Sequence, residues 1–151
     1  MSRILIVYHS QSGNTERMAI AVARGASSIE GTEVAVKRAA EATADDLYQC
    51  DGVALGTPEN FGYMSGMLKD FFERTFYAVE NKVFRKPYVL FVSAGNDGAG
   101  AVNSVERIAL GYQFKKVFDP LIVRGLVTED DLVRCSELGQ TLAGGVELGI
   151  Y

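Results

Sequence analysis

The chain opens with a short apolar strand that leads through a hydroxyl-rich loop into a helix. The strand is Ile4–Tyr8, the loop runs from His9 to Thr15, and a helical pattern of apolar residues follows. The first turn of a helix has backbone N–H groups without internal acceptors, and its dipole favours negative charge. The sequence therefore predicts an anion site at this loop, with a phosphate group as the expected ligand.

The residues of this loop limit the kind of phosphate site that it can form. It contains no Lys or Arg, so backbone N–H groups and the hydroxyls of Ser10, Ser12 and Thr15 would have to meet the phosphate. The Walker pattern, which requires a lysine, and the dinucleotide pattern G-x-G-x-x-G are both absent. The alternative is a plain strand-to-helix turn in which Ser12 or Asn14 caps the helix and nothing binds.

The loop motif Ser10-Gln11-Ser12-Gly13-Asn14-Thr15 has the pattern [ST]-x-[ST]-G-x-T. It resembles the phosphate-binding loop of the flavodoxin family, which holds the 5′-phosphate of FMN. A helix cap would account for one of these hydroxyls, but not for three around a glycine. The resemblance therefore implies FMN as the cofactor.

Length and charge exclude several classes of protein. The 151 residues predict one domain, 1–151, and 48% hydrophobic residues are enough for a core. Fifteen basic against nineteen acidic residues give a net charge of −4, which argues against nucleic acid or an anionic membrane as a partner. No apolar run approaches the ~18 residues of a membrane span, and a strand at the N-terminus leaves no room for a signal segment. We expect a cytoplasmic protein without membrane insertion.

The cysteines and the single histidine do not suggest a catalytic or metal site. Cys50 and Cys135 lie far apart and form no C-x-x-C or metal-ligand spacing, so no metal is expected. We interpret both as small buried apolar residues, with a disulfide between them as the alternative. His9 has no second histidine or evident base partner, which favours a structural role over proton transfer.

Strands and helices alternate five times along the chain, which predicts an α/β protein with a mainly parallel sheet. The second strand alternates apolar and charged residues, as a half-exposed edge strand does, whereas the third is almost continuously apolar. The last helix follows a cap at Thr128 and is expected to loosen at Gly144-Gly145. The expected strands are Ile4–Tyr8, Glu33–Lys37, Gly52–Gly56, Pro87–Val92 and Leu121–Val127.

The loops after the first, third and fourth strands are rich in Gly, Pro, Asn, Ser or Thr, and in a parallel sheet they emerge at one edge. Ligands in open α/β sheets bind outside the carboxyl ends of the strands, where the strand order reverses. Flavodoxin-like proteins follow this rule with the strand order 2-1-3-4-5, and we adopt that order from the resemblance. It predicts a three-layer sandwich, with helices on both faces of a five-stranded parallel sheet, in which these three loops converge.

The second and third loops resemble those of a more specific group of proteins with this fold. The segment from Thr57 to Tyr63, continuing into Met64-Ser65-Gly66, resembles the second flavin loop of tryptophan-repressor-binding-protein-like NAD(P)H:quinone oxidoreductases. Ser93–Gly100 resembles their Gly-rich third loop, so the similarity covers the whole topology of a short-chain member. The expected FMN-binding residues are Ser10, Gln11, Ser12, Gly13, Asn14, Thr15, Pro58, Glu59, Asn60, Phe61, Gly62, Ser93, Ala94, Gly95, Asn96, Asp97 and Gly98.

The residue types of these loops suit a flavin. Phe61 offers an apolar surface for the isoalloxazine ring, and the glycines of the third loop, Gly100 included, let the backbone approach the ring. Backbone donors near the ring stabilise negative charge on reduced flavin. Glu59 and Asp97 would oppose that effect, and they are equally well read as solvated loop acids or turn caps.

The resemblance implies an enzyme in which FMN takes a hydride from NAD(P)H and passes electrons to a quinone or a similar small acceptor. Homo-oligomers are common among the similar enzymes. The chain has no histidine beyond His9 and no tryptophan, so catalytic residues and the positions of nicotinamide and quinone are not carried over.

Two other functions remain open. A flavodoxin-type carrier would shuttle electrons between protein partners, but a net charge of −4 and the absence of tryptophan weaken this interpretation. A flavin-free interaction domain would keep the fold and lose the ligand, because fold alone does not fix function.

Overall fold

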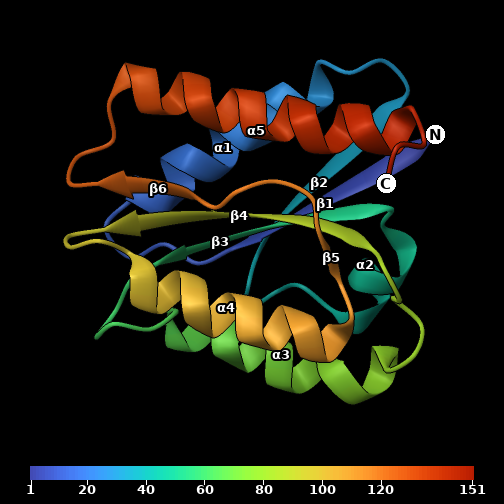
Figure 1. Cartoon of the computed structure of the whole chain (residues 1–151), viewed down its shortest axis with the longest axis horizontal. Helices are drawn as coiled ribbons and strands as arrows, with labels where there is room; N and C mark the ends of the chain where they lie inside the picture. Colours follow the sequence, from blue (N-terminus) through green and yellow to red (C-terminus); the bar gives the residue numbers. More distant parts are fainter.

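A parallel β-sheet runs through the centre of the protein, and helices cover both of its faces (Figure 1). The computed structural model describes all residues from 1 to 151. In chain order the elements are β1 Ser2–Tyr8, α1 Asn14–Ser27, β2 Thr32–Arg38, α2 Ala44–Gln49, β3 Gly52–Pro58, α3 Gly66–Val79, β4 Pro87–Ala94, α4 Ala99–Tyr112, β5 Lys115–Lys116, β6 Leu121–Arg124 and α5 Glu129–Glu147. None of the helices combines the length and apolar composition needed to cross a bilayer.

The strand order is β2-β1-β3-β4-β5, with β6 also paired to β4, and every pairing is parallel. This order confirms the predicted flavodoxin-like sheet, and β2 is its half-exposed edge strand. The expected fifth strand, Leu121–Val127, is found as β6 and ends earlier, at Arg124, and the two-residue strand β5 precedes it beside β4. Four residues, 117–120, separate β5 from β6, whereas only residues 89 and 90 lie between the positions of β4 that pair with them. The chain therefore leaves the ladder over 117–120, where Pro120 has no N–H to donate.

The sheet separates two hydrophobic layers. Alternate residues of β1 point to opposite faces, so that Ile4 and Ile6 pack with α1 and α5 while Leu5 and Val7 pack with α2, α3 and α4. Every residue of β4 is buried, as expected for a central strand. The helix pair α1 and α5 and the helix pair α3 and α4 are seen on opposite sides of the sheet in Figure 1.

The two cysteines are buried and unpaired, in agreement with their interpretation as small core residues. Cys50 belongs to the layer under α2 and α3, and Cys135 belongs to the layer under α1 and α5, so the sheet stands between them. Burial raises the pKa of the Cys50 thiol to about 11 and that of the Cys135 thiol to about 12. Both therefore remain neutral thiols at physiological pH.

Helices α1 and α5 pack closely through glycines. A Cβ on Gly139 would overlap the carbonyl oxygen of Val22, and a Cβ on Gly25 would overlap the carbonyl of Ser136. Contrary to the prediction, α5 does not loosen at Gly144-Gly145 but continues to Glu147.

The C-terminal residue packs against the last turns of α5. A side chain on Gly145 would collide with the ring of Tyr151, whose hydroxyl donates to the Thr141 carbonyl at 3.0 Å. The ring therefore fills the space that a side chain at Gly145 would otherwise occupy.

Two glycine substitutions in α5 test this close packing. We expect Gly139→Ala to lower the free energy of unfolding by about 1–3 kcal/mol, because the new methyl group must push α1 away. Gly144→Ala should raise it by about 0.5–1 kcal/mol, since only Ile29 lies near its Cβ, at 4.0 Å, and alanine favours the helix. Urea unfolding of both variants measures the difference; equal effects would contradict the packing.

Candidate functional site

The loops that follow β1, β3 and β4 meet at one edge of the sheet, as the sequence predicted. They lie together at the left of Figure 1, where the arrows of β3, β4 and β6 end. Two hydrogen bonds to Ser93 join them. Its hydroxyl lies 2.7 Å from the Thr15 hydroxyl, and its carbonyl accepts from the Glu59 N–H at 2.8 Å. Ser93 thus ties the first and second loops to the strand that leads into the third.

The seventeen residues expected to bind FMN differ in how exposed they are to solvent at this edge of the sheet. Thr15, Ser93, Ala94 and Gly98 are buried and form the floor of the candidate site. The partly exposed residues are Ser10, Gly13, Asn14, Pro58, Glu59 and Asn60, and the exposed ones are Gln11, Ser12, Phe61, Gly62, Gly95, Asn96 and Asp97. Their direct contacts with a cofactor remain a prediction.

The N-terminus of α1 is open to a ligand. Gly13 occupies the N-cap position in a left-handed conformation, with φ 104°, and no side chain caps the helix. The alternative in which Ser12 or Asn14 serves as a cap is therefore not what the structure shows. The Gly13 N–H donates to the Ser10 hydroxyl at 3.2 Å, while the N–H groups of Asn14, Thr15 and Glu16 have no acceptor in the protein.

The other four helices begin with side-chain acceptors in place. Thr43 and Thr128 form capping boxes at α2 and α5, and Ser65 accepts from the Leu68 N–H at the start of α3. The start of α4 is capped by Glu59 from the second loop. The N-terminus of α1 is therefore the one without a side-chain acceptor, and its free N–H groups are suited to a phosphate group.

Glu59 and Asp97 act as caps of α4. The Oε2 atom of Glu59 accepts from the N–H groups of Gly100 at 3.0 Å and Ala101 at 3.3 Å. The Oδ1 atom of Asp97 accepts from the Ala99 N–H at 3.0 Å. Of the two interpretations that the sequence left open, the structure shows the cap for both carboxylates.

The second loop is a tight hairpin that exposes an aromatic ring. Asn60 and Tyr63 exchange backbone hydrogen bonds of 2.9 and 3.0 Å. Both residues at its tip, Phe61 and Gly62, have positive φ, 52° and 68°, the pattern of a type I′ turn. Phenylalanine is unusual there, and its side chain is fully exposed. A strained, exposed aromatic residue at a loop tip is better explained by ligand contact than by folding.

Gly100 has a packing role between two loops. A Cβ at this position would overlap the Gly62 carbonyl, so the glycine is required for the contact between the second and third loops. Its expected role in the approach of backbone to the flavin ring stays a prediction. Nothing lies within 4 Å of a Cβ on Gly95, which keeps the expected role of that glycine compatible with the structure.

The structure adds a group that the sequence did not identify. Arg38, at the end of β2, pairs with Glu16 in the first turn of α1, and the same carboxylate accepts from the Tyr8 hydroxyl at 2.9 Å. Burial raises the pKa of Tyr8, and the hydrogen bond to Glu16 adds to that rise. Burial, with a contribution from Arg38, lowers the pKa of His9, which stays neutral near pH 7. These residues adjoin the first loop.

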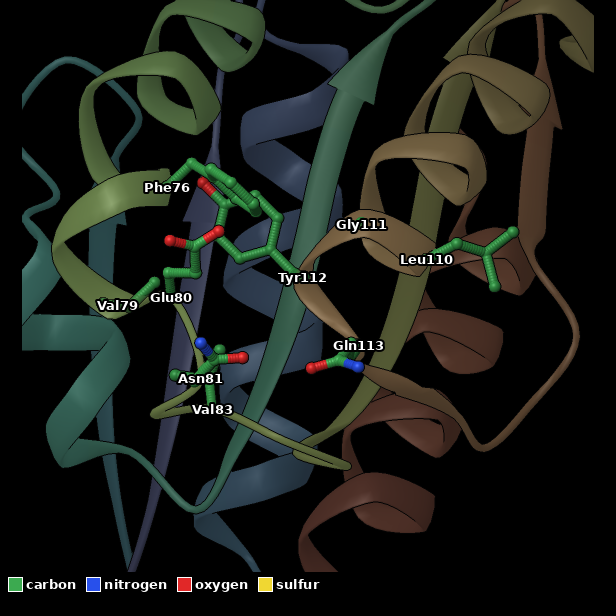
Figure 2. Close-up of a pocket in the computed structure, with 9 residues that line it drawn as sticks. All are labelled: Phe76, Val79, Glu80, Asn81, Val83, Leu110, Gly111, Tyr112 and Gln113. Carbon is green, nitrogen blue, oxygen red and sulfur yellow. The ribbon is translucent and has the colours of Figure 1, made fainter.

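A hollow of about 310 Å³ lies at the opposite edge of the sheet, between the ends of α3 and α4 (Figure 2). The carboxylate of Glu80 and the rings of Phe76 and Tyr112 line it. Two helix C-termini and a carboxylate favour cations, so this hollow is unsuited to a phosphate-bearing cofactor.

Comparison with known proteins gives one family match. Residues 27–121 match the model of a family described as NADPH-dependent FMN reductase. The match contains the second and third loops and begins after the first. The assignment of the first loop therefore depends on its motif and geometry.

Two curated relatives are similar to part of the chain. A flavodoxin of Aquifex aeolicus (strain VF5) is 40% identical over 100 residues, 66% of this chain and 54% of the relative. An NAD(P)H dehydrogenase (quinone) of Acidithiobacillus ferrooxidans is 37% identical over 121 residues, 66% of this chain and 60% of the relative. The chain thus spans between half and two thirds of each relative.

Solved structures share the fold. A flavodoxin from the domain Archaea superposes with a TM-score of 0.84 at 24% identity, over 96% of this chain and 99% of that one. A WrbA-like flavodoxin from Agrobacterium tumefaciens gives a TM-score of 0.78 at 21% identity, over 98% and 99% of the two chains. At these identities the likeness establishes the architecture alone.

Substitution of Glu59 separates its structural role from any contact with a ligand. We expect Glu59→Ala to lower the free energy of unfolding by about 1–2 kcal/mol without any flavin present, because two N–H groups of α4 lose their acceptor. Glu59→Gln keeps one acceptor oxygen and should lose less. Glu73→Ala is the matched control, since Glu73 is exposed and pairs only with Lys69 of its own helix. Urea unfolding in which Glu59→Ala and Glu73→Ala behave alike would refute the cap.

Proposed function

Because this chain belongs to the family of NADPH-dependent FMN reductases, we propose that its FMN takes reducing equivalents from NAD(P)H and passes them to a quinone or a similar small acceptor. The predicted membership of a flavodoxin-like reductase family and the predicted FMN cofactor are confirmed by the family match. The activity is a proposal, since the chain spans only part of its curated relatives. A cytoplasmic location and a homo-oligomeric state remain predictions.

The observation that supports this function most directly is the open N-terminus of α1 beside two joined loops. The N–H groups of Asn14, Thr15 and Glu16 are free to receive the phosphate, with the exposed Ser12 hydroxyl next to them. The Thr15 hydroxyl can accept from Ser93 and keep its own hydrogen for the phosphate. These donors carry no formal charge, which agrees with a site for a single phosphate ester.

The second and third loops are suited to the isoalloxazine ring. Phe61 presents a fully exposed aromatic face, and the N–H groups of Asn96 and Asp97 have no acceptor within the protein. When bound, the flavin itself supplies the hydride and electron chemistry. The protein would hold the ring against the apolar surface and direct the two N–H donors at its polar edge. No side-chain acid or base is required.

A flavodoxin-type electron carrier is the second candidate, and the similarity to the Aquifex flavodoxin supports it. Such a carrier must attract a protein partner over long distances, for which a net charge of −4 gives a weak field. The similarity to an NAD(P)H dehydrogenase (quinone) supports the enzyme instead.

Anaerobic reduction distinguishes the two candidates. Purified protein is loaded with FMN and mixed with NADH or NADPH while the visible flavin band is recorded. We expect the band to bleach with at least one nicotinamide and to return when a soluble benzoquinone is added. A flavin that is reduced only by a partner reductase would indicate the carrier. A colourless protein that does not take up FMN would overturn both and favour a flavin-free interaction domain.

The first loop can be tested by FMN affinity. We expect Ser12→Ala to weaken FMN binding by roughly tenfold, the effect of losing one hydrogen bond to a charged group. Ser27→Ala is the matched control, because Ser27 is exposed at the far end of the same helix and makes no hydrogen bond through its side chain. Dissociation constants from quenching of flavin fluorescence measure both. Equal affinity of the two variants would remove the Ser12 hydroxyl from the phosphate site.

A further inference from the structure

Tyr8, Glu16 and Arg38 form a charge cluster beside the open N-terminus of α1. The Oε2 atom of Glu16 accepts hydrogen bonds from the Tyr8 hydroxyl at 2.9 Å and from Nη2 of Arg38 at 2.5 Å. The guanidinium of Arg38 also lies over the Tyr8 ring, 5.4 Å from its centre. The parallel register pairs Tyr8 with Arg38, so β1 and β2 deliver both residues to the same edge as the first loop.

Glu16 lies where it would oppose a bound phosphate. It is in the first turn of α1, whose free N–H groups are the proposed phosphate donors. A carboxylate there stabilises the helix but repels a dianionic ligand at the same terminus. Its side chain is only 37% exposed, so solvent screens that charge incompletely.

Arg38 is the cation placed to offset this charge. The first loop contains no Lys or Arg, and Arg17 of the same turn instead donates to the Val127 carbonyl at 3.0 Å. Arg38, at the end of β2, contacts Glu16 of α1, although the two residues lie 22 positions apart in the chain. The stacking on Tyr8 and the shared carboxylate oxygen hold its guanidinium in one orientation.

We infer that Arg38 is a positioning residue for the FMN phosphate. By neutralising Glu16 it allows the open N-terminus of α1 to accept a dianion, and it acts through that carboxylate rather than on the phosphate itself. This inference rests on the proposed function and deepens it, because it assigns to β2 a part of the phosphate site that the loop motif lacks.

A double-mutant cycle with two flavins tests the inference. The variants are Arg38→Gln, Glu16→Gln and the double variant, and dissociation constants are measured for FMN and for riboflavin, which lacks the phosphate. We expect Arg38→Gln to weaken FMN binding by roughly tenfold, because one unpaired charge is left near the dianion. Glu16→Gln and the double variant should both bind FMN within about twofold of the wild type, because neither contains the carboxylate through which Arg38 acts. Riboflavin affinity should stay constant throughout.

Arg3→Gln is the matched control for the change in net charge. Arg3 pairs with Glu33 at 3.2 Å between the same two strands, but at the opposite edge of the sheet. Tyr8 lies five positions after Arg3 along the strand, about 17 Å, which exceeds the screening length of ~8–10 Å at physiological salt. We expect FMN affinity to be unchanged in this variant. Added salt should reduce the effect of Arg38→Gln.

Each contrary result has a distinct meaning. Wild-type affinity for FMN in Arg38→Gln, or equal loss for FMN and riboflavin, would overturn the inference and leave the proposed function intact. A double variant as weak as Arg38→Gln would also overturn it, since Arg38 would then act on the phosphate directly. A wild-type protein that binds neither flavin would overturn the proposed function and the inference with it.

Discussion

The candidate site depends on the parallel pairing of β1, β3 and β4. Parallel strands bring their carboxyl ends to one edge, so loops that are distant in sequence become neighbours without any contact of their own. Local bonds then fix the loops against one another. Ser93 contacts Thr15 through its hydroxyl and Glu59 through its carbonyl, and the carboxylate of Glu59 reaches across to α4. The scaffold sets the approximate positions, and these few bonds set the final ones.

The N-termini of α1 and α4, which both lie at this edge, differ in their caps. The N-terminus of α4 is satisfied by Glu59 and Asp97, so its dipole is already compensated. The N-terminus of α1 begins at Gly13 and has no such acceptor. An anion arriving at this edge therefore finds one favourable helix end rather than two. This asymmetry supports the proposed orientation of FMN, in which the phosphate would lie at α1 and the ring toward the second and third loops.

The sequence predicted those parts of the structure that depend on local patterns. Strand and helix periods identified the main elements, and the loop compositions identified the edge where they converge. The split of the fifth strand escaped prediction, because residues 115–124 do not reveal which of them will meet β4. The continuation of α5 through Gly144-Gly145 also escaped, because the ring of Tyr151 occupies the space beside it only in the folded protein.

The charge cluster at the first loop was not predictable for a similar reason. Glu16 lies on α1 and Arg38 on β2, and they meet because β2 pairs with β1 and α1 follows β1 at the same edge. One signal was available in principle: an arginine at the carboxyl end of an edge strand must lie near the loop that follows the neighbouring strand. The loop motif contains only residues of the loop itself and carries no information about the end of the neighbouring strand.

Local fields decide whether a protein of net charge −4 can bind a dianion. Surface carboxylates that lie more than a screening length of ~8–10 Å from the N-terminus of α1 contribute little to the potential there. Glu16 is inside that range, and so is the guanidinium that contacts it. Walker-type loops meet phosphate with a lysine inside the loop. In the proposed site of this chain, free N–H groups would take that role, and an arginine on the adjacent strand would neutralise the nearest carboxylate. The absence of a cation from a phosphate loop is therefore no measure of the charge that the folded site presents.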